Sequence, residues 1–173
     1  MQKLKPPCGY NLEGLAKILL LDFEDFGGFQ FDGDDLYSNC LVTSILRNGD
    51  FIEIEAPDGA KASSALNGKI YAHTLETFVG QLSADLTSNL HLGTKRRHLP
   101  VFQLKNGRYF TFGYDAGAAL TFTTQTAEAN GALISITAAS IYPLFEVIPE
   151  ALITSYGVDF IPSFDQGAYC ETD

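Results

Sequence analysis

The sequence predicts a mainly β domain, an antiparallel β-sandwich or small barrel, with one flanking α-helix. Short segments rich in β-branched and aromatic residues recur along the chain and are bounded by turn-forming residues. Several of these boundaries are Asn-Gly steps, which supply the positive φ that a tight hairpin turn requires. One stretch places its leucines at helical spacing, namely Leu82, Leu86 and Leu90.

The first half of the chain predicts a buried strand, a hairpin and a long strand. Leu15–Phe23 is a short apolar run of the kind found in buried strands. Leu41–Leu46 and Phe51–Glu55 flank the turn Arg47-Asn48-Gly49-Asp50, so we expect these two strands to pair as a hairpin. Lys69–Val79 contains Thr, Tyr, Phe and Val and predicts a long strand before the helix.

The second half predicts a meander, in which each of four strands pairs with the next one along the chain. An Asn-Gly turn at residues 105–107 separates the first two strands, and residues 125–131 separate the last two. In the last strand Ile134 and Ile136 alternate with mostly polar residues, which places the isoleucines on the core face. The four predicted strands are Val101–Leu104, Arg108–Tyr114, Ala118–Thr124 and Ala132–Ala139.

The single helix has recognisable ends. Ser83 is the expected N-cap, and Gly93 is expected to take the left-handed position that ends many helices. Lys95, Arg96 and Arg97 follow, where the negative end of the helix dipole favours cations. The same basic cluster could instead pair with the acidic loop of an adjacent copy.

Three segments lack periodicity and are predicted to be irregular: Asp25–Tyr37, Pro57–Gly68 and Ser155–Asp173. They are longer than ordinary turns within a domain, so we expect them, with both termini, to form contacts between subunits. Residues 1–150 form the predicted domain, and residues 151–173 form a C-terminal extension. The extension is too apolar for a free disordered arm, so we expect it to pack on its own domain or on a neighbouring subunit.

Composition restricts the partners of the chain. At 173 residues it suits one domain with a sizeable core. A net charge of −10 disfavours binding to nucleic acid and to anionic membranes. The charged fraction is only 18%, as in a subunit whose outside becomes interface. The N-terminus lacks the apolar core of a signal peptide, and the longest apolar run, Ile18–Leu21, is too short for a membrane span, so we expect synthesis in a cytoplasm.

The residues that carry chemistry form no recognisable catalytic, cofactor-binding or metal-binding motif. The three cysteines have no CxxC spacing, and the three histidines have no partner at metal-ligand spacing. The acidic cluster lacks the alternating ligands of an EF-hand, so we interpret it as a surface loop. We therefore predict that the protein is no enzyme and uses no cofactor or metal. The residues considered were Cys8, Cys40, Cys170, His73, His91, His98, Asp22, Glu24, Asp25, Asp32, Asp34 and Asp35.

The order of these elements, over roughly residues 9–148, resembles phage tail tube proteins. More narrowly, it resembles the small tube-like virion proteins of phages that infect Bacteroides-type bacteria. An initial strand with the pattern "GL-KI-L" precedes a helix and a closing "NGKY-FG---G" hairpin in those proteins. The matching residues here are Gly14, Leu15, Lys17 and Ile18 at the start, and Asn106, Gly107, Arg108, Tyr109, Gly113 and Gly117 in the hairpin.

The resemblance implies a structural role in a virion tail. Copies of such proteins form sixfold rings that stack into a tube, and genomic DNA passes through the channel without specific binding. The expected partners are further copies and other tail or neck proteins, with no membrane and no cofactor. An acidic channel wall would keep DNA from adhering, and Glu53, Glu55 and Glu76 are the candidates to line it.

Other functions stay open at the level of sequence. The protein could occupy a neck, connector or distal-tail position in a virion instead of the tube. It could also be a non-catalytic β-sandwich binding module that uses the aromatic extension as a platform. An enzyme of jelly-roll type would need several histidines and acids on neighbouring strands, and His73 with Glu76 does not complete such a set.

Overall fold

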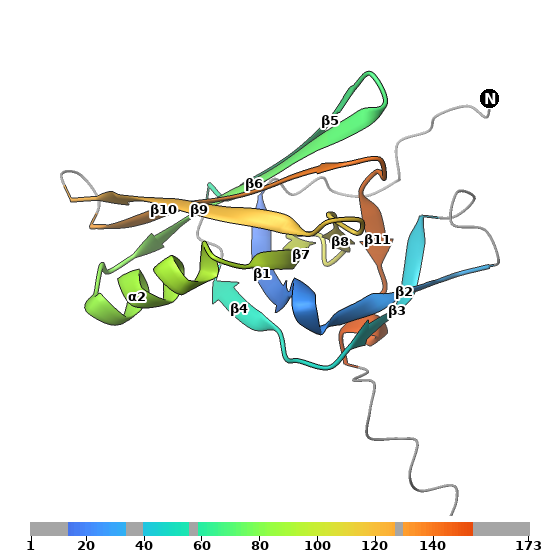
Figure 1. Cartoon of the computed structure of the whole chain (residues 1–173), viewed down its shortest axis with the longest axis horizontal. Coiled ribbons are helices and arrows are strands. Elements are labelled where there is room, and N and C mark those ends of the chain that lie inside the picture. Colours follow the sequence, from blue (N-terminus) through green and yellow to red (C-terminus); the bar gives the residue numbers. More distant parts are fainter. Residues whose placement is uncertain (1–13, 34–39, 56–58, 127–129, 154–173) are drawn as a thin grey trace, which may run out of the picture.

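The structure is a computed structural model, and it describes residues 14–33, 40–55, 59–126 and 130–153, with the side chain of Glu55 left out. The predicted class is confirmed, because the described chain is mostly β-strand with a single α-helix (Figure 1). The elements are β1 (Leu15–Asp22), the 3₁₀ helix η1 (Phe23–Asp25), β2 (Phe26–Phe31), β3 (Leu41–Arg47), β4 (Ile52–Glu55), β5 (Lys61–Asn67), β6 (Ile70–Gly80), α2 (Ala84–Gly93), β7 (Arg97–Leu104), β8 (Tyr109–Thr111), β9 (Ala118–Gln125), β10 (Gly131–Ser140), β11 (Phe145–Val147) and the 3₁₀ helix η2 (Pro149–Leu152).

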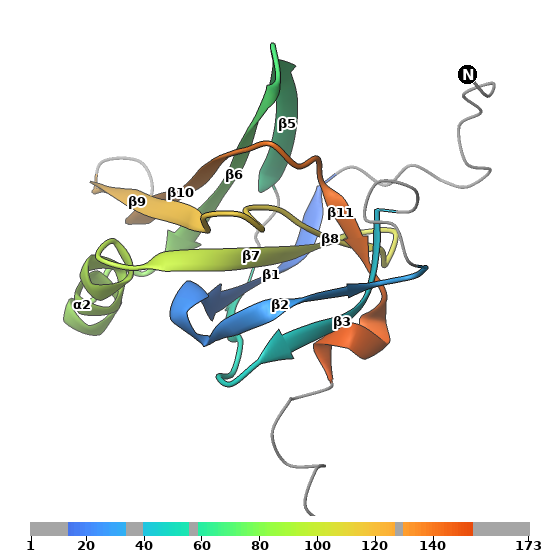
Figure 2. The same cartoon turned by 45° about the vertical axis from the view of Figure 1, so that its right-hand side comes forward.

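All eleven described strands belong to one continuous sheet that folds over itself (Figures 1 and 2). The strand order is β2-β3-β11-β8-β7-β9-β10-β6-β5, and β1 pairs with both β7 and β4 outside this path. The prediction of an antiparallel sheet needs one correction, because β11 runs parallel to β3. The other strand pairs are antiparallel.

Strands β1 and β7 lie between two hydrophobic cores. Ile18 and Leu20 of β1 pack in the first core, with residues of β6, β9, β10 and α2. Leu19 and Leu21 point the other way and pack in the second core, with residues of β2, β3 and β11. Burial of both faces explains why Ile18–Leu21 of β1 is an unbroken apolar run although the neighbouring strands are antiparallel.

The helix starts as predicted and ends differently. The Ser83 hydroxyl accepts a hydrogen bond from the amide of Leu86 at 3.1 Å, which confirms the N-cap. Gly93 lies inside the helix, and the C-cap is Thr94 in right-handed conformation, so the predicted left-handed glycine is wrong. The amides of Lys95 and Arg96 close the last turn on the carbonyls of Leu92 and Gly93 instead.

The predicted hairpin between residues 41–46 and 51–55 is also wrong. Both segments are strands, but β3 pairs with β2 and β11, whereas β4 pairs with β1. Gly49 does not adopt positive φ, and the Asn48 amide bonds the carbonyl of Asp25, 2.9 Å away. Val42 belongs to the second core and Ile54 packs against the first, so the chain must cross between layers here.

Two of the strand pairs predicted for the meander are confirmed. The β7–β8 hairpin is confirmed, with Gly107 at φ +89, and so is the β9–β10 pair. Strand β9 does not pair with β8, however, but with the start of β7 at Arg97 and His98. Gly113 and Gly117, at φ +83 and +66, permit the turn that takes the chain across to the other side of β7.

Two segments predicted to be irregular contain strands. Phe26–Phe31 of the first forms β2, and Lys61–Asn67 of the second forms β5. Asn67 pairs with Ile70 around a two-residue turn in which Gly68 has φ +67. This Asn-Gly step was the missed signal for a hairpin. Residues 155–173 lie outside the described residues, and the predicted boundary after residue 150 falls inside η2.

Candidate functional site

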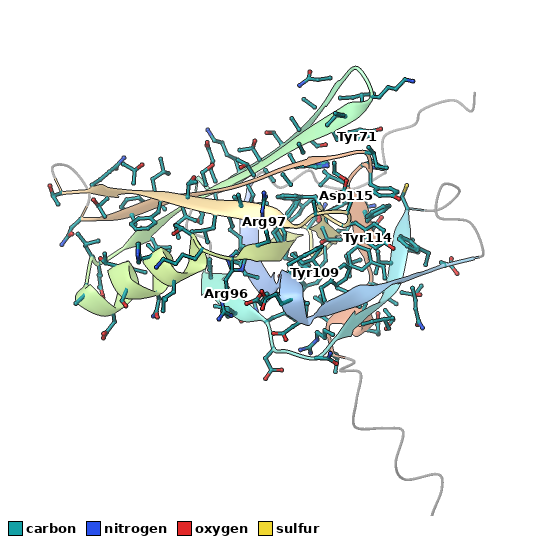
Figure 3. All side chains as sticks on the ribbon, viewed as in Figure 1. Tyr71, Arg96, Arg97, Tyr109, Tyr114 and Asp115 are labelled. Carbon is teal, nitrogen blue, oxygen red and sulfur yellow. The ribbon has the colours of Figure 1, made fainter. Side chains whose placement is uncertain are left out.

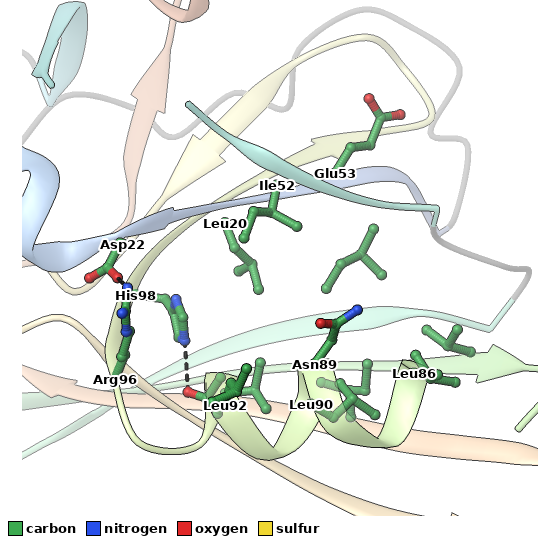
Figure 4. Close-up of a pocket in the computed structure, with 15 residues that line it drawn as sticks. Leu20, Asp22, Ile52, Glu53, Leu86, Asn89, Leu90, Leu92, Arg96 and His98 are labelled. Carbon is green, nitrogen blue, oxygen red and sulfur yellow. Dashed lines mark hydrogen bonds and ion pairs between the residues drawn. The ribbon is translucent and has the colours of Figure 1, made fainter. Parts of the chain in front are cut away.

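An open pocket of about 690 Å³ lies between β4 and α2 (Figure 4). Its volume is typical of sites that bind small molecules or short peptide segments. The floor is formed by residues of β1, β6, β9 and β10 that also belong to the first core or pack against it. Its apolar lining consists of Leu20, Ile52, Ile54, Val79, Leu86, Leu90, Leu92, Leu120 and Ile134, and Asp22, Glu53, Asn89, Arg96 and His98 are its polar side chains.

One end of the pocket is closed by an ion pair between Asp22 and Arg96. Asp22 lies at the end of β1, and its carboxylate also accepts a hydrogen bond from the amide of Glu24 at 3.1 Å. Burial raises the pKa of Asp22, but the bonds from Glu24 and Arg96 outweigh it, so the pKa is lowered from its ordinary value. The pair therefore stays ionised at neutral pH.

His98 fastens α2 to β7 beside this ion pair. Its Nε2 lies 2.9 Å from the carbonyl oxygen of Gly93, and because a carbonyl only accepts, Nε2 carries the proton. The other ring nitrogen, Nδ1, has no partner among the described residues and is shielded from solvent. A shielded nitrogen cannot reach a substrate in the pocket, so the role of His98 in this arrangement is structural.

The histidine and the glutamate of the jelly-roll alternative are not brought together. His73 is buried between the rings of Tyr71 and Phe112, and its Nε2 lies 3.1 Å from the carbonyl oxygen of Tyr142. Glu76 is three positions along β6, hence on the opposite face, and its carboxylate pairs with Lys61 at 2.9 Å. The two residues form no common site.

The acidic cluster does not converge on one point. Asp22 is engaged by Arg96, and Asp34 and Asp35 lie outside the described residues. Within the described ranges, no group of three or more His, Cys, Asp or Glu side chains is placed to hold a metal ion. Cys40 is a free, partly buried thiol, whereas Cys8 and Cys170 also lie outside the described residues.

The basic cluster is split between two sides of the molecule. Figure 3 shows Arg96 directed towards β4, and Arg97 directed towards β9. Arg96 pairs with Asp22, an acid of the predicted acidic cluster. The pair forms within one chain, whereas the sequence suggested a pair with an adjacent copy. The three cations therefore do not form one surface for a phosphate backbone.

Two of the three acids predicted to line a channel carry a lysine partner. Glu53 pairs with Lys17 at 2.8 Å, and Glu76 pairs with Lys61. Both pairs are partly exposed, so water screens them, but each reduces the local negative charge. Glu55 ends β4, and its side chain is not among those described.

Strand β5 is an edge of the described sheet. It is the last strand of the sheet, six of its seven residues are exposed, and the tip of the β5–β6 hairpin projects as an arm (Figures 1 and 2). Leu66 and Ile70, which are 56% and 50% exposed, place apolar side chains near the tip. An unpaired strand edge offers free amide and carbonyl groups to another strand. Sequence reasoning missed this edge, since it took the segment for a loop.

None of the described helices is long and apolar enough to cross a membrane. Comparisons of the chain with protein-family models, with curated proteins and with solved structures each find no match.

Proposed function

We propose that this chain is a phage virion structural protein, a tail-tube-like subunit that forms stacked homo-oligomeric rings. The resemblance of its sequence to tail tube proteins implies that each ring has six subunits. The observation that supports this best is the projecting arm, in which the outer edge of β5 pairs with no described strand. In a ring, such an edge is covered by the next copy, which removes an aggregation hazard that a monomer would carry. A neck, connector or distal-tail position would use the same edge.

The geometry of the arm identifies the amides that a neighbouring strand would use. Asn67 and Ile70 flank a two-residue turn and therefore form a hydrogen-bonded pair, and such pairs alternate along antiparallel strands. The amides of Ala62, Ser64 and Leu66 consequently point away from β6. A strand added to β5 would bond to these three groups.

Replacement of Ser64 by proline tests this assembly. Proline removes one outward amide and leaves the bonds to β6 intact, because an edge strand tolerates proline where its N–H faces outwards. We expect the unsubstituted chain to form rings, detected by light scattering and negative-stain imaging, and Ser64→Pro to remain a monomer. Ser64→Ala, which keeps the amide, should assemble normally. Equal assembly of the proline variant would exclude β5 as the interface, and a monomeric unsubstituted chain at high concentration would exclude self-assembly.

The pocket supports a second candidate, a non-catalytic binding module. Its volume and apolar lining suit a small ligand as well as a segment of protein. Saturable binding of 1-anilinonaphthalene-8-sulfonate, an anionic dye whose aromatic rings bind apolar surface, to a chain that stays monomeric would favour this function. Loss of that binding in Ile52→Glu, a substitution at an exposed lining residue, would assign the dye to this pocket.

A further inference from the structure

We propose that the pocket between β4 and α2 is the binding site for residues 154–173 of the same chain. The inference does not depend on ring assembly, since it concerns the single subunit. It rests on the apolar lining of the pocket, on the point where the described chain ends and on the composition of the segment that follows.

The pocket exposes large apolar side chains on both of its sides. Ile52 on β4 is 63% exposed and Leu92 on α2 is 58% exposed, and they contribute to the same lining. A concave pocket with a mostly apolar lining is typical of a binding site. An occupant with several large apolar side chains would bury these residues and the floor beneath them.

The described chain ends beside the residues that lead into β4, one wall of this pocket. One guanidinium, that of Arg47, donates hydrogen bonds to the carbonyl of Leu152 and to the carbonyl of Gly49. Gly49 is three residues before Ile52, which lines the pocket. The segment that follows Ile153 therefore starts beside the residues that precede β4 in the sequence. Its twenty residues extend to roughly 65 Å, so reach does not limit the contact.

The composition of residues 154–173 fits the lining. The segment contains Tyr156, Phe160, Ile161, Phe164 and Tyr169, which are too many large apolar side chains for a stretch that stays in water. Attachment to the domain gives the segment a high effective concentration at a nearby site, about the millimolar range for a short flexible link. Modest affinity is then enough to fill the pocket.

Charge permits this occupant as well. The segment carries four acidic residues and no lysine or arginine. Both acids that line the pocket are already paired, Asp22 with Arg96 and Glu53 with Lys17, so they repel an acidic segment only weakly. Arg96 has 63% of its side chain exposed and offers further N–H donors at the pocket's end.

The N-terminal segment is the less suitable occupant. Residues 1–13 contain two lysines and one glutamate, and fewer large apolar residues. They join the described chain at Gly14, which lines a different and smaller pocket of about 390 Å³ beside β5. The C-terminal segment is therefore favoured by its composition and by where it joins the domain.

Thiol labelling of the full-length chain tests the proposal. In a monomeric background that carries Ser64→Pro, and with Cys8, Cys40 and Cys170 replaced by serine, Leu92→Cys places a reporter thiol in the pocket, and Leu66→Cys places a matched reporter on the arm. Both positions are similarly exposed in the described structure. We expect the thiol at position 92 to react about tenfold more slowly than that at position 66, because the segment covers it. The double change Phe160→Asp and Phe164→Asp should abolish this difference without altering the rate at position 66.

Each outcome decides the question. Equal rates at the two positions in the unsubstituted segment, repeated with Asn89→Cys as a second pocket reporter, would overturn the proposal. Protection that disappears on roughly a hundredfold dilution would also overturn it, because the occupant would then be the segment of another copy. Light scattering on the same samples separates this result from ring formation, since protection in a monomer supports the inference even if no rings form.

Discussion

The guanidinium of Arg47 lies 3.3 Å from the carbonyl oxygen of Leu152, a residue that follows it by 105 positions. The same side chain bonds the carbonyl of Gly49, pairs with Asp50 and lies over the ring of Phe51, 4.8 Å from its centroid. It is only 7% exposed although it is charged. Arg47 thus joins the end of β3, the crossing to β4 and η2 into one unit.

Replacement of Arg47 by alanine should lower the free energy of unfolding by about 2–3 kcal/mol. The substitution leaves the carbonyls of Gly49 and Leu152 without their donor and removes the contact with Phe51. Urea denaturation measures the loss. Arg97→Ala is the matched control, because Arg97 is exposed, and it should change stability by less than about 0.5 kcal/mol. A similar loss in both variants would mean that the Arg47 contacts contribute nothing specific.

Burial of His73 predicts that stability falls as the solution is acidified. Burial lowers the pKa of His73 from its ordinary value of 6.5, and the hydrogen bond to Tyr142 and the charge of Asp115 only partly oppose it. The unfolded chain therefore takes up the proton first, so the contribution of His73 is complete above pH 6.5 and is lost as pH falls towards the lowered pKa. Urea denaturation at pH 7.5 and at about pH 5.5 should show this loss.

His73→Phe keeps an aromatic ring between Tyr71 and Phe112 and removes the titrating group. The variant should be less stable overall, since the bond to the Tyr142 carbonyl is lost, but its stability should depend less on pH. Ile136→Val, a small change in the same core, should lower stability equally at both pH values. An unchanged pH dependence in His73→Phe would assign the effect to other groups.

Local patterns predicted the elements whose partners are adjacent in sequence. The alternation of Ile134 and Ile136 with polar residues identified both the strand β10 and its buried face, because a two-residue period is a property of any half-buried strand. The Asn-Gly step at Gly107 and the N-cap at Ser83 likewise act within a few residues. At these positions the packing of the rest of the chain agrees with the local signal.

Pairings that depend on distant layers could not be predicted in this way. The step at Asn48-Gly49 resembles a hairpin turn, but burial of Val42 in one core and packing of Ile54 against the other send the chain across the domain. The pocket could not be predicted for the same reason, since its lining is assembled from six separate strands and one helix. Hydrophobic periodicity tells which face is buried and not which neighbour buries it.

Two glycines that face each other across β10 and β6 should respond differently to substitution. Gly131 pairs with Gly80 at the end of the two strands. A Cβ at Gly131 would overlap the carbonyl oxygen of Val79 and the ring of Phe78, whereas a Cβ at Gly80 meets nothing within 4 Å. Backbone cannot yield as a flexible side chain can, so Gly131→Ala should destabilise the protein by about 2–4 kcal/mol.

Gly80→Ala is the matched control, because it adds the same methyl group at the same level of the sheet. We expect it to change the free energy of unfolding by less than about 1 kcal/mol, since its φ is not positive and the space around it is open. Thermal and urea denaturation of both variants provide the comparison. If the two substitutions have equal effects, close packing of β10 against β6 does not account for the glycine at position 131.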